Sequence, residues 1–271
     1  MWRALTALIT LAAAQAAVAL DLTDDQTELM LDADIVILGE IHDNAVHHAG
    51  QADLMRLIAP KAVVFEMLNA EMAEGVNAAD RSDIAALGAA IGWQDAGWPD
   101  IALYAPVFDA LGDADAVGAM VARDSVRAAF AEGAAGVFGD GAEAFGLTES
   151  LPDADLDIRK QLQFGAHCAA MPFEMMGGLV EAQRLRDAAF SKVALTALET
   201  FGAPVVVIAG NGHARRDWAM PHMIALAEPD VSTYTVGFVE APAAPDDPRF
   251  DLTIVTDPAP RQDPCAAFDK N

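Results

Sequence analysis

The sequence is poor in cysteine, tyrosine and basic residues. Its 271 residues include 2 Cys and 2 Tyr, and 16 Lys and Arg stand against 41 Asp and Glu, a formal net charge of −25. The shortage of cations argues against nucleic acid as a partner, because binding to phosphates depends on Lys and Arg. The shortage of cysteine argues against a cysteine-based zinc site, since neither Cys168 nor Cys265 has a Cys or His at zinc-finger spacing. We interpret the acidity as a means of solubility.

Long apolar runs are also lacking. No stretch reaches the ~18 uninterrupted apolar residues that a membrane helix needs. The N-terminus has a shorter run: Arg3 precedes the uncharged segment 4–14, and Ala17-Val18-Ala19 has the small-x-small pattern of a cleavage site. This combination is typical of a signal peptide over residues 1–19, cleaved near Ala19. No lipobox cysteine is present, so we expect a soluble, exported, periplasmic protein without a transmembrane segment.

Several catalytic motifs are absent. The sequence has no Gly-x-Ser-x-Gly elbow, no P-loop and no His-Glu-x-x-His, which argues against α/β-hydrolase, P-loop and zincin chemistry. The two cysteines can form a disulfide in an oxidising compartment. The sequence leaves open whether their Cα atoms come within the ~7 Å that such a bond requires.

What is present is a series of apolar, β-branched segments that alternate with amphipathic helices. Continuous apolar runs over 33–40, 62–67 and 203–210 predict strands that are buried on both faces. Further strands are expected at 114–121, 231–239 and 251–255, helices at 45–58, 153–170, 172–201 and 215–227, and a mobile loop at 134–150. Together they predict an α/β fold with a mostly parallel central sheet and helices on both faces. We expect residues 20–271 to form a single domain with a helical insertion around 70–112.

Chemically capable side chains follow three of these strands. Glu40 and His42 follow the first, Glu66 the second, and Asn211 and His213 the strand at 203–210. Ligands of open α/β sheets bind beyond the carboxyl ends of the strands, so we expect these residues to share one site. Two histidines and two carboxylates can bind a divalent metal, with His42 and His213 as ligands, or perform acid–base chemistry.

Three segments carry a family resemblance. Residues 36–43, with Gly39-Glu40-Ile41-His42, and residues 208–214, with Gly210-Asn211-Gly212-His213, resemble the Gly-x-x-His motifs of the ChaN-like haem-binding iron-uptake proteins. That family belongs to the wider Tiki and erythromycin-esterase-like superfamily. The segment 183–187 resembles the Gln-x-x-Arg-Asp helix of the ChaN-like branch, and His167, Pro172 and Glu66 fit the same branch.

The resemblance implies a haem-binding protein of periplasmic haem and iron uptake that is not an enzyme, and a homodimer that holds haem between its two subunits. The cofactor-binding residues carried over or placed nearby are Glu40, His42, Glu66, His167, Gln183, Arg186, Asp187, Asn211, His213 and Arg215. Haem needs an axial ligand, an apolar slot and cations for its propionates. Arg215 and Arg216 are the candidate cations, and neither Tyr104 nor Tyr234 lies in a matching motif.

Two other functions stay open. One is a metal-dependent hydrolase of the superfamily's enzyme type, with Glu40, His42, Glu66 and His213 as its catalytic set. The other is a partner-binding scaffold in which the motif residues only cap the strands.

Overall fold

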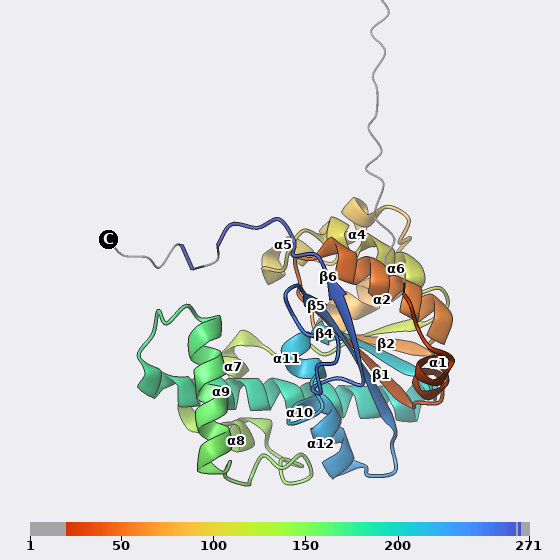
Figure 1. The fold of residues 1–271 in the computed structure, drawn as a ribbon. Helices are drawn as coiled ribbons and strands as arrows, with labels where there is room; N and C mark the ends of the chain where they lie inside the picture. Colours follow the sequence, from red (N-terminus) through yellow and green to blue (C-terminus); the bar gives the residue numbers. More distant parts are fainter. Residues whose placement is uncertain (1–19, 264, 267–271) are drawn as a thin grey trace, which may run out of the picture.

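The computed structural model describes residues 20–263 and 265–266. Figure 1 shows a central sheet flanked by helices, with a helical lobe extending to one side. The expected signal peptide lies outside the described residues. The strands are β1 (Ile35–Glu40), β2 (Ala62–Phe65), β3 (Asp115–Gly118), β4 (Val205–Gly210), β5 (Thr233–Glu240) and β6 (Leu252–Thr256). The helices are α1 (Asp24–Leu31), α2 (Ala45–Ile58), α3 (Ala70–Ala78), α4 (Ile84–Ala90), α5 (Trp93–Ala96), α6 (Ala105–Ala110), α7 (Arg123–Glu132), α8 (Ala134–Phe138), α9 (Asp153–Ala166), α10 (Met176–Phe201), α11 (Asn211–Ala214) and α12 (Met220–Ala227), with 3-10 turns η1 (Ile101–Tyr104) and η2 (Phe173–Met175).

All the paired strands are parallel, in the order β3-β2-β4-β1-β5-β6. The chain leaves β1 towards β2 on one side and leaves β4 towards β5 on the other, so the direction of winding reverses between β1 and β4. Such a reversal opens a crevice at the carboxyl ends of the two strands, where ligands of doubly wound folds bind. In the register, Glu40 at the end of β1 lies opposite Gly210 at the end of β4.

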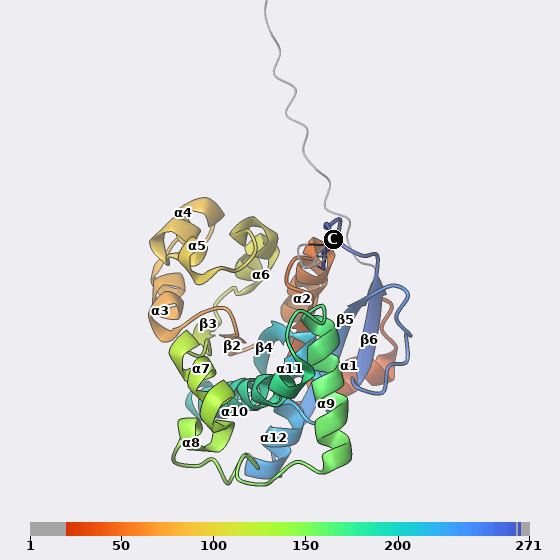
Figure 2. The same cartoon turned by 90° about the vertical axis from the view of Figure 1, so that its left-hand side faces the viewer.

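The two faces of the sheet support separate cores because alternate side chains of a strand point to opposite faces. Val36 and Leu38 pack into one core with α2 and α6, and Ile35 and Ile37 pack into the other with α10 and α12. Figure 2, turned by 90°, shows α2 and α10 on opposite sides of the strands. The predicted α/β fold, with a parallel sheet and helices on both faces, is confirmed.

Two segments differ from the sequence-based expectation. The predicted helix 215–227 is helical only over α12, because residues 215–219 form turns, and the short helix α11 ends before the predicted range begins. Residues 134–150, expected to form a mobile loop, begin with helix α8, and Phe145 and Leu147 are buried in a small third core. The apolar side chains within this glycine-rich segment anchor it to α10 and α12.

Cys168 and Cys265 form a disulfide, with 5.3 Å between their Cα atoms, which joins the end of α9 to the C-terminal segment. Among the described residues, no helix combines the length and apolar character that a membrane crossing would require.

Candidate functional site

The ends of β1 and β4 are packed closely around two glycines. A Cβ atom at Gly39 would lie 2.3 Å from Asn211 Oδ1, and one at Gly210 would lie 3.0 Å from His42 Nε2. The missing side chain at Gly210 therefore leaves the space that the His42 ring occupies. The two glycines allow residues from both strand ends to converge at the crevice.

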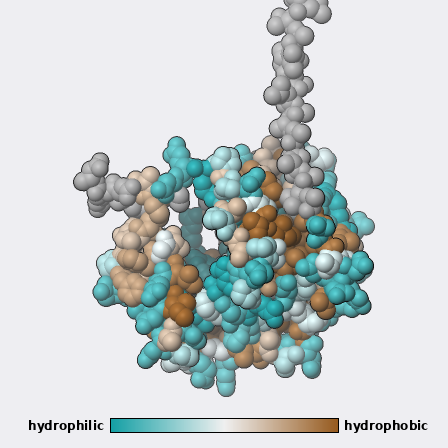
Figure 3. All heavy atoms as spheres, viewed as in Figure 1, coloured by the Kyte–Doolittle hydropathy of each residue, from teal (hydrophilic) through white to brown (hydrophobic). Residues whose placement is uncertain are grey.

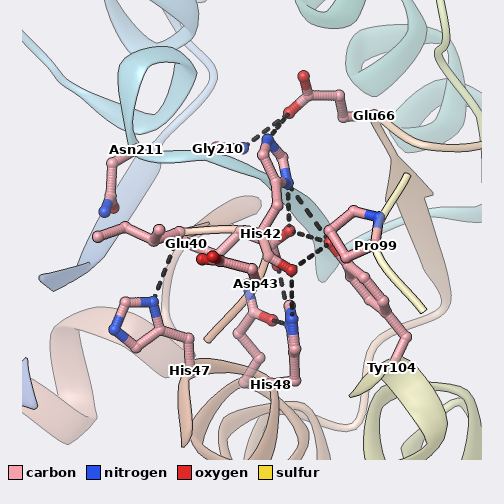
Figure 4. Close-up of polar contacts among 12 residues, drawn as sticks. Glu40, His42, Asp43, His47, His48, Glu66, Pro99, Tyr104, Gly210 and Asn211 are labelled. Atoms are coloured by element: carbon pink, nitrogen blue, oxygen red, sulfur yellow. Dashed lines mark hydrogen bonds and ion pairs between the residues drawn. The ribbon is translucent and has the colours of Figure 1, made fainter. Parts of the chain in front are cut away.

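A buried carboxylate holds His42 at this crevice (Figure 4). Glu40 Oε1 lies 2.7 Å from His42 Nδ1, and Glu40 is 2% exposed. Because Nδ1 is bound by a carboxylate, Nε2 is the ring nitrogen that faces the rest of the site. The side chain of His42 is 30% exposed. Burial lowers the pKa of His42, but the hydrogen bond to Glu40 and the charge of Glu66 outweigh burial and raise it overall.

Two residues that the sequence did not single out orient Glu40. The Tyr104 hydroxyl donates to Glu40 Oε1 at 2.6 Å, and His48 Nδ1 lies 3.2 Å from Glu40 Oε2. Burial favours the neutral acid, yet His42 and His48 together hold the pKa of Glu40 well below its usual range. Tyr104 comes from η1, within the segment expected to form the helical insertion, and has no motif of its own. For His48, the only signal in the sequence is its proximity to His42 in the chain.

Glu66, after β2, lies between the two motif histidines. Its Oε2 accepts a hydrogen bond of 2.7 Å from the Gly210 backbone N–H and lies 3.8 Å from His42 Nε2. Its Oε1 lies 3.5 Å from His213 Nε2. Burial opposes its charge, but the charge and hydrogen bond of His213 outweigh burial and lower the pKa of Glu66 to about 2. A carboxylate faced by two imidazoles is thus ionised at neutral pH.

His213 repeats the arrangement of His42 from the other side. Its Nδ1 lies 2.6 Å from Asp187 Oδ1 on α10, and the Gln183 side-chain amide lies 3.0 Å from the same nitrogen. Burial works against the charge of His213, but Glu66 and Asp187 raise its pKa to about 10. Burial also raises the pKa of Asp187. We assign the proton to His213, because it faces two carboxylates.

The remaining predicted residues lie at different distances from this cluster. Arg186 lines a cleft with Glu66, and Asn211 donates to the Phe238 carbonyl at 2.6 Å. Arg215 forms two hydrogen bonds to Asp217 and packs over Trp218. His167 lies exposed at the end of α9, where its ring bonds to the Gln163 carbonyl, so no contact joins it to the cluster.

His47, next to His48, has a structural role. Its Nδ1 accepts a hydrogen bond from the Ile41 N–H, and its Nε2 therefore carries the proton and donates to Thr256 Oγ1 at 2.9 Å. Burial and the neighbouring His48 lower the pKa of His47 to about 4. This residue is neutral and ties the turn after β1 to the end of β6.

A cleft opens beside Glu66. It has a volume of about 340 Å³ and is bounded by α5, α7 and α10. Trp98, which lines it, packs against His42 with 5.0 Å between ring centroids. The walls combine apolar side chains with three arginines: Ala96, Trp98, Met120, Val121, Val126 and Phe190, and Arg123, Arg127 and Arg186.

The described residues contain no group of three or more His, Cys, Asp or Glu side chains arranged to hold a metal ion. The two imidazoles and Glu66 are instead arranged as ion pairs at 3.5 and 3.8 Å. The geometry as it stands favours acid–base and hydrogen-bonding roles for these groups.

The sequence matches the family described as "Haem-binding uptake, Tiki superfamily, ChaN" over residues 27–224. No curated protein matches the chain. Among solved structures it is similar to "Cofacial heme binding to ChaN of Campylobacter jejuni", with a TM-score of 0.60 and 16% identity over 84% of this chain and 89% of that one. A mutant of the erythromycin esterase EreC in its open conformation matches with a TM-score of 0.43 and 14% identity, over 83% of this chain and 76% of that one. The similarity to the Campylobacter jejuni structure concerns the fold alone.

Proposed function

The chain belongs to the ChaN family of haem-binding uptake proteins in the Tiki superfamily, and we propose that it binds haem in the cleft beside Glu66. The observation that carries the proposal is the lining of this cleft, where six apolar side chains meet three arginines. Haem requires this combination of an apolar slot and cations for its propionates. Three arginines around one cleft support an anionic ligand, because the chain has only 16 basic residues against 41 acidic ones.

Arg186 is the arginine best placed to receive a propionate. It lines the cleft, and among the described residues it has no hydrogen bond and no ion pair with a carboxylate within 4.0 Å. Arg123 donates to the Ala96 carbonyl, and Arg127 pairs with Asp124 at 2.9 Å on the surface. An unpaired guanidinium at an apolar cleft matches a carboxylate in charge and shape.

His42 is the side chain that would hold the iron. Tyr104 is fully buried and donates to Glu40, and Tyr234 is 5% exposed. The His213 side chain is 7% exposed, whereas that of His42 is 30% exposed and packs against Trp98 of the cleft. A carboxylate on the far ring nitrogen makes an imidazole a stronger ligand. Bound haem would supply the iron that the uptake route transports.

The test is a titration of the purified protein with hemin, followed by absorbance. We expect a saturable Soret shift with a defined stoichiometry. The affinity should fall in Arg186→Gln and stay unchanged in His222→Ala, which alters an exposed residue of α12. A featureless, non-saturating spectrum would remove the proposal.

Export to the periplasm and a role in iron uptake are part of the proposal. The disulfide supports an oxidising compartment, because such bonds persist outside the cytosol. ChaN of Campylobacter jejuni shows cofacial haem binding. We infer that two copies of this chain pair when haem is bound. Size-exclusion chromatography with and without hemin tests this pairing.

A second candidate function is hydrolysis, favoured by the two imidazole–carboxylate pairs around Glu66. In this reading His42 and His213 exchange protons with substrate and water. Assays with ester and peptide substrates, with and without Zn²⁺ or Mn²⁺, test it on the wild type and on His42→Ala. Inertness under all these conditions would exclude the candidate.

A further inference from the structure

A second pocket lies on the opposite side of His213 from the haem cleft. Figure 3 shows the surface hollowed between the lobe that carries α9 and the body of the molecule. The pocket has a volume of about 150 Å³, well below the roughly 300–1,000 Å³ of sites for drug-sized ligands. Residues from α9, α10, α11 and the following turn line it, among them Arg159, Leu162, Val180, Gln183 and Trp218.

The charge in this pocket is unusual for the molecule. Among the described residues, Arg159 has no hydrogen bond and no carboxylate within 4.0 Å, and its Nε atom is shielded from solvent. Most other arginines of this acidic chain pair with a carboxylate, as Arg184 does with Glu181 and Arg215 with Asp217. A buried N–H without an acceptor costs free energy, so a missing acceptor is expected beside Arg159.

The remaining walls define the size and shape of that acceptor. Leu162, Ala166 and Val180 present an apolar surface, and Leu162 is 46% exposed. The Trp218 ring packs under Arg159 at 4.7 Å and under Arg215 at 3.5 Å. Asp187 also lines the pocket and disfavours a dianion such as phosphate. A monoanion with a short apolar body fits both the charge and the walls.

We propose that this pocket binds a carboxylate carried on a short apolar arm, with Arg159 as its ionic partner. The floor of the pocket is Gln183 and Asp187, which both contact His213 Nδ1. Gln183 and Asp187 therefore separate a ligand in this pocket from His213, and the negative charge of that ligand changes the electrostatic environment of His213. The carboxylate belongs either to a free short-chain acid or to the arm of a larger ligand in the hollow.

The first arm of the test is a propionate titration followed by the indole N–H signal of Trp218 in NMR spectra, assigned with Trp218→Phe. We expect a saturable shift in the wild type and an affinity about tenfold weaker in Arg159→Gln, as for the loss of one charged hydrogen bond. Arg81→Gln is the matched control, because Arg81 donates to the Gly112 carbonyl and neither residue lines the pocket. This arm needs no haem, so a saturable shift that Arg159→Gln weakens supports the pocket even if the proposed function fails.

The second arm compares hemin with its dimethyl ester on the same variants. If propionate does not bind, an advantage of hemin over the ester that is present in the wild type and lost in Arg159→Gln assigns the pocket to a ligand's carboxylate arm. The proposed carboxylate site is wrong if both arms fail. The first arm fails when propionate leaves the Trp218 signal unchanged. The second fails when hemin does not bind, or when Arg159→Gln leaves the advantage of hemin over its ester unchanged.

Discussion

At the residue scale, the sequence indicated the main groups of the site but not their support. Glu40, His42, Glu66 and His213 follow strands, and that position alone predicts a shared edge of the sheet. Tyr104 and His48 orient Glu40 from a 3-10 turn and a helix that the sequence describes only as apolar or amphipathic. Their role depends on the packing of η1 against α2, which no local pattern encodes.

Replacing Tyr104 by Phe tests this support. The buried Glu40 carboxylate loses its 2.6 Å hydrogen bond while the ring packing against His48 is kept. We expect the free energy of unfolding in urea to fall by about 1–3 kcal/mol. Tyr234→Phe is the control, because the Tyr234 hydroxyl has no hydrogen-bond partner among the residues described. Equal losses in the two variants would show that the Glu40 contact contributes nothing specific.

The charge of His213 predicts a pH dependence of stability. Its pKa is about 10 in the folded chain, against an ordinary value of 6.5. A raised folded pKa stabilises the native state fully below pH 6.5, and that contribution is lost as the pH rises towards 10. The difference in unfolding free energy between wild type and His213→Gln should therefore shrink between pH 6.5 and 10. A difference that is constant across this window would contradict the assigned proton.

At the scale of secondary structure, the glycine at the end of β4 sets the space for His42. A Cβ atom at Gly210 would lie 3.0 Å from His42 Nε2, while one at Gly136 would meet nothing within 4 Å. We expect Gly210→Ala to displace the His42 ring and weaken hemin binding, with little effect on folding. Gly136→Ala should bind hemin like the wild type. Unchanged hemin affinity in Gly210→Ala would separate His42 from the haem site.

Helix α9 is the element most dependent on a covalent bond. None of its 14 residues is buried, and Cys168 just beyond its end is joined to Cys265. Replacing both cysteines by serine should lower the free energy of unfolding by about 2–4 kcal/mol. Hydrogen exchange should become faster in residues 153–175 and stay unchanged in β1 and β4. Uniform exchange across the chain would show that packing alone holds α9.

At the scale of the whole molecule, the sheet was predictable and the clefts were not. The apolar runs of β1, β2 and β4 identify buried parallel strands because both faces of each are covered. The cleft in which we propose that haem binds depends instead on how α5, α7 and α10 meet, and its residues, such as Trp98, Met120 and Arg186, lie far apart in the chain. Pairwise packing of distant helices has no local signature, so the sequence did not predict the cleft.

The central claim is that haem iron is held by His42 beside the apolar cleft. Resonance Raman spectra of the ferrous haem complex, made with and without ¹⁵N-labelled histidine, test it most directly. We predict an iron–histidine band that shifts with the label, is absent in His42→Ala, and returns when imidazole is added to that variant. A band that persists unchanged in folded His42→Ala, or that ignores the label in the wild type, would contradict the claim.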